Sequence, residues 1–257
     1  KGAIMRLLLD IGNSSVNWAS EKESIFLSHG SFIYDKNNFE NSLQENISLT
    51  KNTSKVLVSN VAGLDIFNSL TSWAEKHGSL ELWQSCIEKE FKGLKTSYIK
   101  TEQMGIDRWL SMVACWERYQ SSLCVVSCGT ALTIDSIDHE GNHLGGYILP
   151  GVDLMQQSLI KNTENINFNI NHCPSIDYAS DTKTAVNNGA FLSLVSLLGP
   201  ILIPNKPFGG LSFILLWTLS EPELLNPSLF ISAKSSSSLK TLGFGFPYCL
   251  SGVTVPT

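Results

Sequence analysis

The 257-residue sequence has few charged residues and no basic cluster. Charged side chains make up 16% of the chain, against about 25% in an average soluble protein, and the formal net charge is −5. Nonspecific nucleic-acid binding depends on Lys and Arg neutralising phosphates, so this composition argues against a nucleic-acid partner. Hydrophobic residues make up 43% of the chain, which is typical of a globular protein with a sizeable core.

The sequence also lacks the spacings that mark metal and disulfide sites. Its six cysteines contain no Cys-x-x-Cys pair, which argues against a zinc site and favours reduced thiols. Its five histidines show no ligand spacing, and we expect each of them at the surface or in a turn. A Gly-x-Ser-x-Gly nucleophile elbow is missing too.

The sequence also shows no hydrophobic run long enough to span a membrane and no secretory signal. The apolar run Phe191 to Ile203 is too short to span a membrane and contains Pro200. Residues 1–4 precede Met5, where the first predicted strand begins, and no secretory signal follows. We therefore expect a soluble, cytoplasmic protein with no membrane partner.

The two commonest nucleotide-binding loops are absent, but two other turns have the character of phosphate sites. Neither Gly-x-x-x-x-Gly-Lys-Ser/Thr nor a Gly-x-Gly-x-x-Gly after a strand occurs. Instead, a strand leads through Asp10 into Gly12-Asn13-Ser14, where exposed amides of a small-residue turn attract anions. A second strand leads into Gly129-Thr130-Ala131, where a hydroxyl adds a donor. Either turn alone is also explained by an ordinary hairpin, but two facing turns predict a grip on a polyphosphate.

Strands and helices alternate along the chain, which favours an α/β architecture. The pattern predicts a hairpin around residues 6–16, a strand at 54–60, helices at 64–76 and 107–120, a strand at 123–127 and a helix at 152–160. The two strand, turn, strand units suggest a duplicated plan with two lobes. We place the lobes at residues 5–117, with the first turn, and residues 118–257, with the second.

Between the two turns, Gly105-Ile106-Asp107-Arg108-Trp109 begins a predicted core helix. Asp107 is open to two interpretations: an N-cap whose carboxylate accepts backbone amides, or a general base beside a cationic phosphate binder, Arg108. An acid next to a base is also often only a solvated ion pair. The residues themselves leave these alternatives open.

Taken together, these segments resemble the type III pantothenate kinases, including the homologues called Bvg accessory factors. The matching pieces are DIGNSSVNWA, VSNVA, a tyrosine seven residues before GIDRW, GTALTID, GNHLGGYILPG and DTKTAVNNG. Several separate motifs in family order make a chance match improbable.

The resemblance implies an acetate kinase, hexokinase and actin-like fold, with two lobes each built on a ribonuclease-H-like sheet. It implies transfer of the ATP γ-phosphate to pantothenate, which gives 4'-phosphopantothenate in the first step of coenzyme A biosynthesis. It also implies Mg²⁺, a monovalent cation such as K⁺ or NH₄⁺, and a homodimer.

Carried over by position, the resemblance implies a role for each motif residue. The ATP phosphates would be held by Asp10, Gly12, Asn13, Ser14, Gly129, Thr130 and Ala131, with Asp10 near Mg²⁺. Asp107 would accept the proton of the pantothenate hydroxyl. The substrate would be held by Tyr98, Gly105, Ile106, Asp107, Arg108 and Thr182, the last from the partner subunit.

The sequence departs from the family in two places. Ser127 stands where many members carry an Asp associated with the metal and cation region. After about residue 200 the family's adenosine loop and final pattern are not found, and residues 190–257 hold only five charged side chains and seven of the nine prolines. We interpret this change as a divergence of the reading frame or of the gene.

These departures keep two other functions open. A non-catalytic accessory protein on the same fold would account for Ser127 and the altered tail. A kinase of the same fold acting on another small hydroxylated substrate is the third candidate, because a fold does not determine a substrate.

Overall fold

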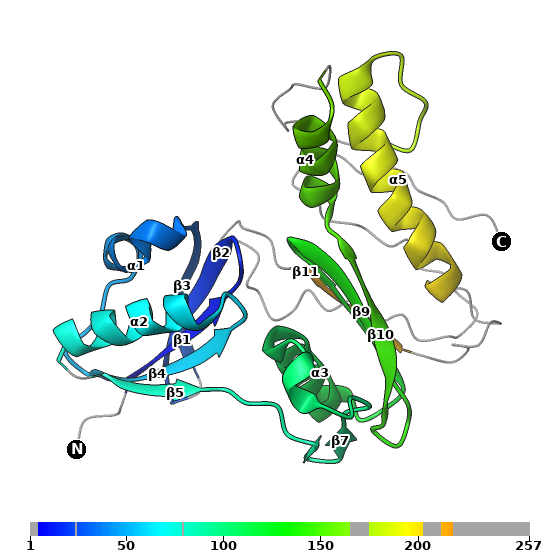
Figure 1. Cartoon of the computed structure of the whole chain (residues 1–257). Helices are drawn as coiled ribbons and strands as arrows, with labels where there is room; N and C mark the ends of the chain where they lie inside the picture. Colours follow the sequence, from blue (N-terminus) through cyan, green and yellow to red (C-terminus); the bar gives the residue numbers. More distant parts are fainter. Residues whose placement is uncertain (1–4, 24, 79, 165–174, 203–211, 218–257) are drawn as a thin grey trace.

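The computed structural model describes residues 5–23, 25–78, 80–164, 175–202 and 212–217, and it shows two halves that each contain a β-sheet (Figure 1). One sheet has five strands and the other has four. Residues 203–211 and 218–257 lie outside the described residues, and so does most of the tail for which we infer a divergence.

The N-terminal sheet has the strand order β3-β2-β1-β4-β5. Its strands are β1 (Met5–Ile11), β2 (Ser15–Lys22), β3 (Ile25–Ile33), β4 (Thr53–Asn60) and β5 (Glu81–Gln84). β2 runs antiparallel to both β1 and β3, whereas β4 is parallel to both β1 and β5. The predicted N-terminal hairpin and the predicted strand at residues 54–60 are thus confirmed.

Helices on this half are η1 (Lys36–Asn38), α1 (Phe39–Asn46) and α2 (Leu64–Lys76), the last with the predicted bounds. Alternate residues of β1 enter the core, because successive side chains of a strand point to opposite faces. Leu7, Leu9 and Ile11 are buried there together with Leu70 and Trp73 of α2.

The C-terminal sheet repeats the plan of the first. It contains β8 (Leu123–Cys128), β9 (Ala131–Ile137), β10 (His143–Pro150) and β11 (Ser212–Trp217) in the order β10-β9-β8-β11. β9 runs antiparallel to β8 and β10, and β11 runs parallel to β8. These four strands match β1 to β4 in order and direction, which confirms the expected duplicated α/β fold.

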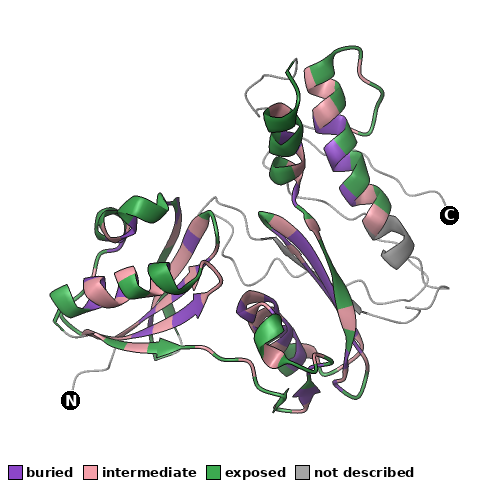
Figure 2. Ribbon diagram, viewed as in Figure 1, coloured by how far each residue is buried: buried purple, intermediate pink, exposed green. Residues whose placement is uncertain are grey.

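The segment between the sheets contains β6 (Glu90–Phe91), β7 (Leu94–Lys95), η2 (Thr101–Gln103) and α3 (Ile106–Tyr119). Trp109 and Met112 of α3 are buried with Leu123, Val125 and Ile137 of the second sheet, and Figure 2 shows this concentration of buried residues. The sequence boundary after residue 117 assigned α3 to the N-terminal lobe. The apolar face of α3 packs on β8 and β9, and α3 also contacts β4 of the N-terminal sheet.

Two further helices, α4 (Val152–Asn162) and α5 (Thr182–Leu202), pack against each other beside the second sheet (Figure 1). Within the described ranges, no helix combines the length and apolarity needed to cross a membrane. Burial raises the pKa of the Cys124 thiol to about 11 and that of Cys115 to about 12, so neither is a thiolate nucleophile at neutral pH.

Candidate active site

The two predicted phosphate turns meet. The turn after β1 is closed by the Gly12 N–H, which donates to the Ser15 carbonyl at 2.9 Å. The turn after β8 approaches it so closely that the Thr130 hydroxyl donates to the Ser14 hydroxyl at 3.3 Å. Ser14 and Thr130 are both exposed. Residues 116 positions apart in the chain therefore present their hydroxyls at one place on the surface.

Tyr34 supports the first turn by two hydrogen bonds, and no sequence motif indicated a role for this tyrosine. Its hydroxyl donates to the Gly12 carbonyl at 2.6 Å, and its own N–H donates to the Ser14 carbonyl at 3.4 Å. The side chain is otherwise buried in the N-terminal core, and burial raises the pKa of the Tyr34 hydroxyl. The turn is thus fixed from its inner side, while Asn13 and Ser14 remain exposed.

Gly151, just before α4, holds the second turn. Its N–H donates to the Thr130 carbonyl at 2.9 Å. A Cβ at position 151 would lie 2.1 Å from the Gly129 carbonyl oxygen, which is backbone and cannot rotate away. The close approach therefore requires glycine at this position.

Asp107 lies in the first turn of α3, and its carboxylate is held over the start of the helix. The N-cap of α3 is Gly105, so the interpretation of Asp107 as an N-cap is wrong. The Arg108 N–H donates to Asp107 Oδ1 at 2.8 Å. A Cβ at position 105 would lie 2.4 Å from the same oxygen, so Gly105 makes room for the carboxylate.

Asp10 faces the same region from β1. Its neighbours Leu9 and Ile11 point into the core, so strand alternation directs Asp10 to the opposite face of the sheet. Burial raises the pKa of the Asp10 carboxyl, and the negative charge of Asp107 raises it further. The negative charges of Asp10 and Asp107 thus disfavour each other, and a cation bound by Asp10 would offset this repulsion.

The carboxylates present suit a metal that shares its ligands with a substrate. No group of three or more His, Cys, Asp or Glu side chains in the described part of the chain is placed to hold a metal ion. Mg²⁺ in phosphate-transfer sites is commonly bound by one or two carboxylates together with substrate phosphates and water. Asp10 is the side chain that fits this role.

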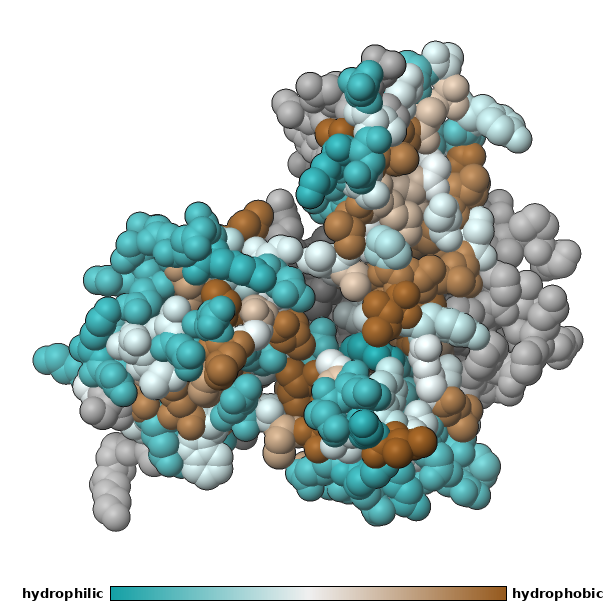
Figure 3. Space-filling model, in the orientation of Figure 1, coloured by the Kyte–Doolittle hydropathy of each residue, from teal (hydrophilic) through white to brown (hydrophobic). Residues whose placement is uncertain are grey.

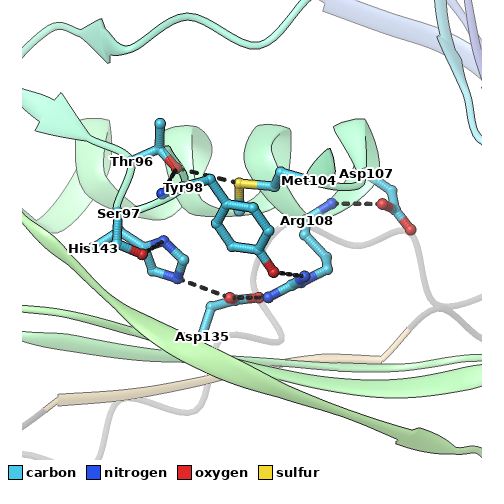
Figure 4. Close-up of polar contacts among 8 residues, drawn as sticks. All are labelled: Thr96, Ser97, Tyr98, Met104, Asp107, Arg108, Asp135 and His143. Atoms are coloured by element: carbon cyan, nitrogen blue, oxygen red, sulfur yellow. Dashed lines mark hydrogen bonds and ion pairs between the residues drawn. The ribbon is translucent and has the colours of Figure 1, made fainter. Parts of the chain in front are cut away.

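Arg108 is buried and turned away from Asp107, as Figure 4 shows. Its Nε and Nη2 donate to the two carboxylate oxygens of Asp135 on β9 at 3.0 and 2.5 Å, and its Nη1 donates to the Tyr98 hydroxyl at 3.0 Å. Burial by itself lowers the pKa of Arg108, but these hydrogen bonds hold it above its ordinary value. The interpretation of residues 107 and 108 as a solvated ion pair is wrong, because the partner of Arg108 is Asp135.

His143 on β10 completes this network from the other side. One ring nitrogen, Nε2, lies 3.0 Å from Asp135 Oδ1, and Nδ1 lies 3.1 Å from the Ser97 hydroxyl. The expectation that every histidine lies at the surface or in a turn is wrong for His143, which is 3% exposed. Burial raises the pKa of Asp135, but the hydrogen bonds from His143 and Arg108 outweigh it and hold this pKa below its ordinary value.

The remaining substrate residues of the sequence prediction fall in two places. Tyr98 is half-buried above Arg108, with the guanidinium carbon 5.7 Å from the centre of its ring. Thr182 is exposed at the start of α5, and Figure 1 shows that this end of α5 points away from α3. One chain thus joins the two turns through Thr130 and Ser14 and places Tyr98 on Arg108 of α3, whereas the start of α5, with Thr182, lies apart.

The comparisons with known proteins agree in one family. Residues 6–202 match the family described as Type III pantothenate kinase. The type III pantothenate kinase of Nitrosococcus oceani is 32% identical over 199 residues, which cover 76% of this chain and 75% of that protein. The corresponding enzyme of Pseudoalteromonas translucida is 32% identical over 202 residues, which cover 77% of each protein.

Solved structures give weaker matches. A Baf family transcriptional activator from Campylobacter jejuni is 24% identical with a TM-score of 0.47, covering 76% of this chain and 78% of that one. The PPX-GPPA enzyme of Aquifex aeolicus is 12% identical with a TM-score of 0.33, covering 62% of this chain and 56% of that one. On the strength of the sequence match over residues 6–202, this chain belongs to the type III pantothenate kinase family.

Proposed function

We propose that this protein transfers the γ-phosphate of ATP to the primary hydroxyl of pantothenate, the first step of coenzyme A biosynthesis, in the cytoplasm. One observation carries the proposal: the Thr130 hydroxyl bonds to the Ser14 hydroxyl, so the two phosphate turns form one site. Burial raises the pKa of the Asp10 carboxyl at the base of the first turn, and the negative charge of Asp107 raises it further. A polyphosphate on the turns would therefore lie beside a carboxylate that can accept a proton.

ATP binds through its phosphates in this proposal. The phosphates would lie on the turns Gly12, Asn13, Ser14 and Gly129, Thr130, Ala131. The Gly12 and Gly129 N–H groups close these turns on the Ser15 and Ala131 carbonyls, so the exposed Asn13, Ser14 and Thr130 would supply donors to the phosphate oxygens. Asp10 is the Mg²⁺ ligand, and bound Mg²⁺ supplies neutralisation of the charge on the β- and γ-phosphates. Ser127, in the strand before the second turn, offers a hydroxyl where a carboxylate would add charge. A K⁺ or NH₄⁺ ion would supply further positive charge to the phosphates.

Pantothenate binds at the start of α3. Asp107 orients the primary hydroxyl and accepts its proton as the oxygen attacks the γ-phosphorus, because a neutral alcohol is a poor nucleophile. Tyr98, Gly105, Ile106 and Arg108 form the rest of the substrate segment.

A homodimer supplies the last substrate residue, Thr182, from the partner subunit. Exposed apolar side chains on β10 and α4 support an interface: Leu144, Tyr147, Ile148, Leu154 and Leu159. Figure 3 shows apolar side chains gathered on this half of the molecule. Light scattering of the purified protein is expected to give the mass of two chains, and a Tyr147→Glu, Ile148→Glu variant the mass of one. A wild-type monomer with full activity would contradict the dimer.

The experiment that tests the function is a coupled ADP-release assay with pantothenate, MgATP and K⁺. We expect pantothenate-dependent ADP release that is lost without Mg²⁺ and weakened when Na⁺ replaces K⁺. If the protein turned over another hydroxylated acid but not pantothenate, the result would favour a kinase of the same fold that acts on a different substrate. Folded, dimeric protein without any turnover would favour the accessory role.

A further inference from the structure

Five polar side chains form a continuous hydrogen-bonded chain beneath the proposed pantothenate site (Figure 4). The chain runs from Ser97 through His143, Asp135 and Arg108 to the hydroxyl of Tyr98. Asp135 and His143 have no role in the proposed mechanism, although both are buried. A buried polar network that is fully satisfied imposes a single arrangement on its members.

The direction of donation can be assigned around Asp135. The ionised Asp135 carboxylate only accepts, and it receives Nε–H and Nη2–H from Arg108. The Nε2 atom of His143, which faces Asp135, must then carry a proton, and Nδ1 forms the hydrogen bond with the Ser97 hydroxyl. The Asp135 carboxylate thus accepts three hydrogen bonds, two from Arg108 and one from His143.

At the other end, Arg108 determines how the Tyr98 hydroxyl is used. Arginine has donors only, so Nη1–H donates to the Tyr98 oxygen. The hydroxyl proton of Tyr98 must therefore point elsewhere, toward an acceptor. A carboxylate or amide oxygen of pantothenate is such an acceptor.

We propose that Asp135 and His143 are positioning residues that act through Arg108 to fix the Tyr98 hydroxyl as a donor toward an acceptor oxygen of pantothenate. This inference rests on the proposed function. The Arg108 guanidinium is 4% exposed at its side chain and is engaged by Asp135 and Tyr98, so it acts on the substrate through Tyr98.

Gly146 shows how closely the protein is built around this network. It is the partner of Asp135 across the β9–β10 ladder. A Cβ at position 146 would lie 2.4 Å from Asp135 Oδ1 and 2.9 Å from Arg108 Nη2. A side chain at position 146 would displace the Arg108–Asp135 ion pair, so this position of β10 requires glycine.

A double-mutant cycle on the Michaelis constants tests the inference. Tyr98→Phe removes the donor, and Asp135→Asn places an amide N–H against the N–H groups of Arg108. We expect each variant to raise the KM for pantothenate about tenfold, the effect of losing one good hydrogen bond, with little change in the KM for ATP. The double variant is expected to be no worse than the worse single variant, because both changes remove the same contact.

Controls separate positioning from general damage. Glu117 lies on α3, the helix that carries Arg108, and forms an exposed ion pair with Lys92. Glu117→Gln removes this pair and is expected to leave the KM values for pantothenate and ATP unchanged. If Asp135→Asn does not fold, His143→Leu replaces it in the double-mutant cycle. His143→Gln keeps an N–H donor and is therefore expected to have a KM for pantothenate close to that of the wild type.

The outcomes are distinct. A wild-type protein without pantothenate-dependent ADP release overturns the proposed function and this inference with it. An active wild type in which the two effects multiply in the double variant, or in which the KM for ATP rises equally, overturns the inference alone.

Discussion

Asp107→Asn is expected to lower kcat by about 10²–10⁴-fold, the range that a positioned general base contributes. Asparagine has the same shape, and its Oδ1 can still accept from the Arg108 N–H as the carboxylate does at 2.8 Å. It cannot accept a proton from the substrate hydroxyl. The loss should therefore appear in turnover, measured by ADP release at saturating substrates, rather than in folding.

The KM for ATP distinguishes this role from a general defect. The phosphate turns do not depend on Asp107, so the KM for ATP should change little. Asp65→Asn is a matched control, because Asp65 is the acidic residue in the first turn of α2, as Asp107 is in α3. An Asp107→Asn enzyme with wild-type kcat would remove Asp107 from the mechanism.

Arg108→Met is expected to lower the free energy of unfolding by about 3–5 kcal/mol, the usual effect of removing one partner of a buried ion pair. The side chain of Asp135 is 2% exposed and accepts two hydrogen bonds from Arg108. In the variant its negative charge would stay buried without the guanidinium that neutralises it, which destabilises the fold. Urea unfolding followed by tryptophan fluorescence measures the change.

Two further substitutions define what the pair requires. Arg108→Lys keeps the charge but cannot donate to both Asp135 oxygens and to Tyr98 together, so we expect an intermediate loss of stability and reduced turnover. Lys92→Met removes a solvent-exposed ion pair with Glu117 and should have little effect. An Arg108→Met protein as stable as wild type would show that the Arg108–Asp135 pair does not stabilise the fold.

The local features of this fold follow from short stretches of sequence. The short apolar run at residues 5–11 and the period of 3.6 in residues 64–76 predict β1 and α2, because burial is decided within a few residues. The two phosphate turns were also predictable, since a glycine with a polar neighbour after an apolar strand is a local signal. That the two turns face each other could also be anticipated from the duplicated pattern, and the structure joins them by the hydrogen bond between the Thr130 and Ser14 hydroxyls.

The residues that support the phosphate turns and the start of α3 through distant contacts gave no such local signal in the sequence. Tyr34 reaches the Gly12 carbonyl from 22 residues away, and Arg108 reaches Asp135 from 27 residues away. A lone tyrosine or histidine in the sequence has no periodicity or spacing that reveals its partner. The packing of the apolar face of α3 on β8 and β9 had no local signal either, because nothing in a short stretch says which of two similar sheets such a face will cover.

The sequence by itself determined the strands, the helices and the candidate chemistry of the turns and of Asp107, since each depends on neighbours a few positions apart. Only the tertiary structure decided that Arg108 pairs with Asp135 rather than with its neighbour Asp107, and that His143 is buried. Burial is the physical reason: a guanidinium removed from water must find an opposite charge within hydrogen-bond distance, and chain packing alone selects the carboxylate that meets it.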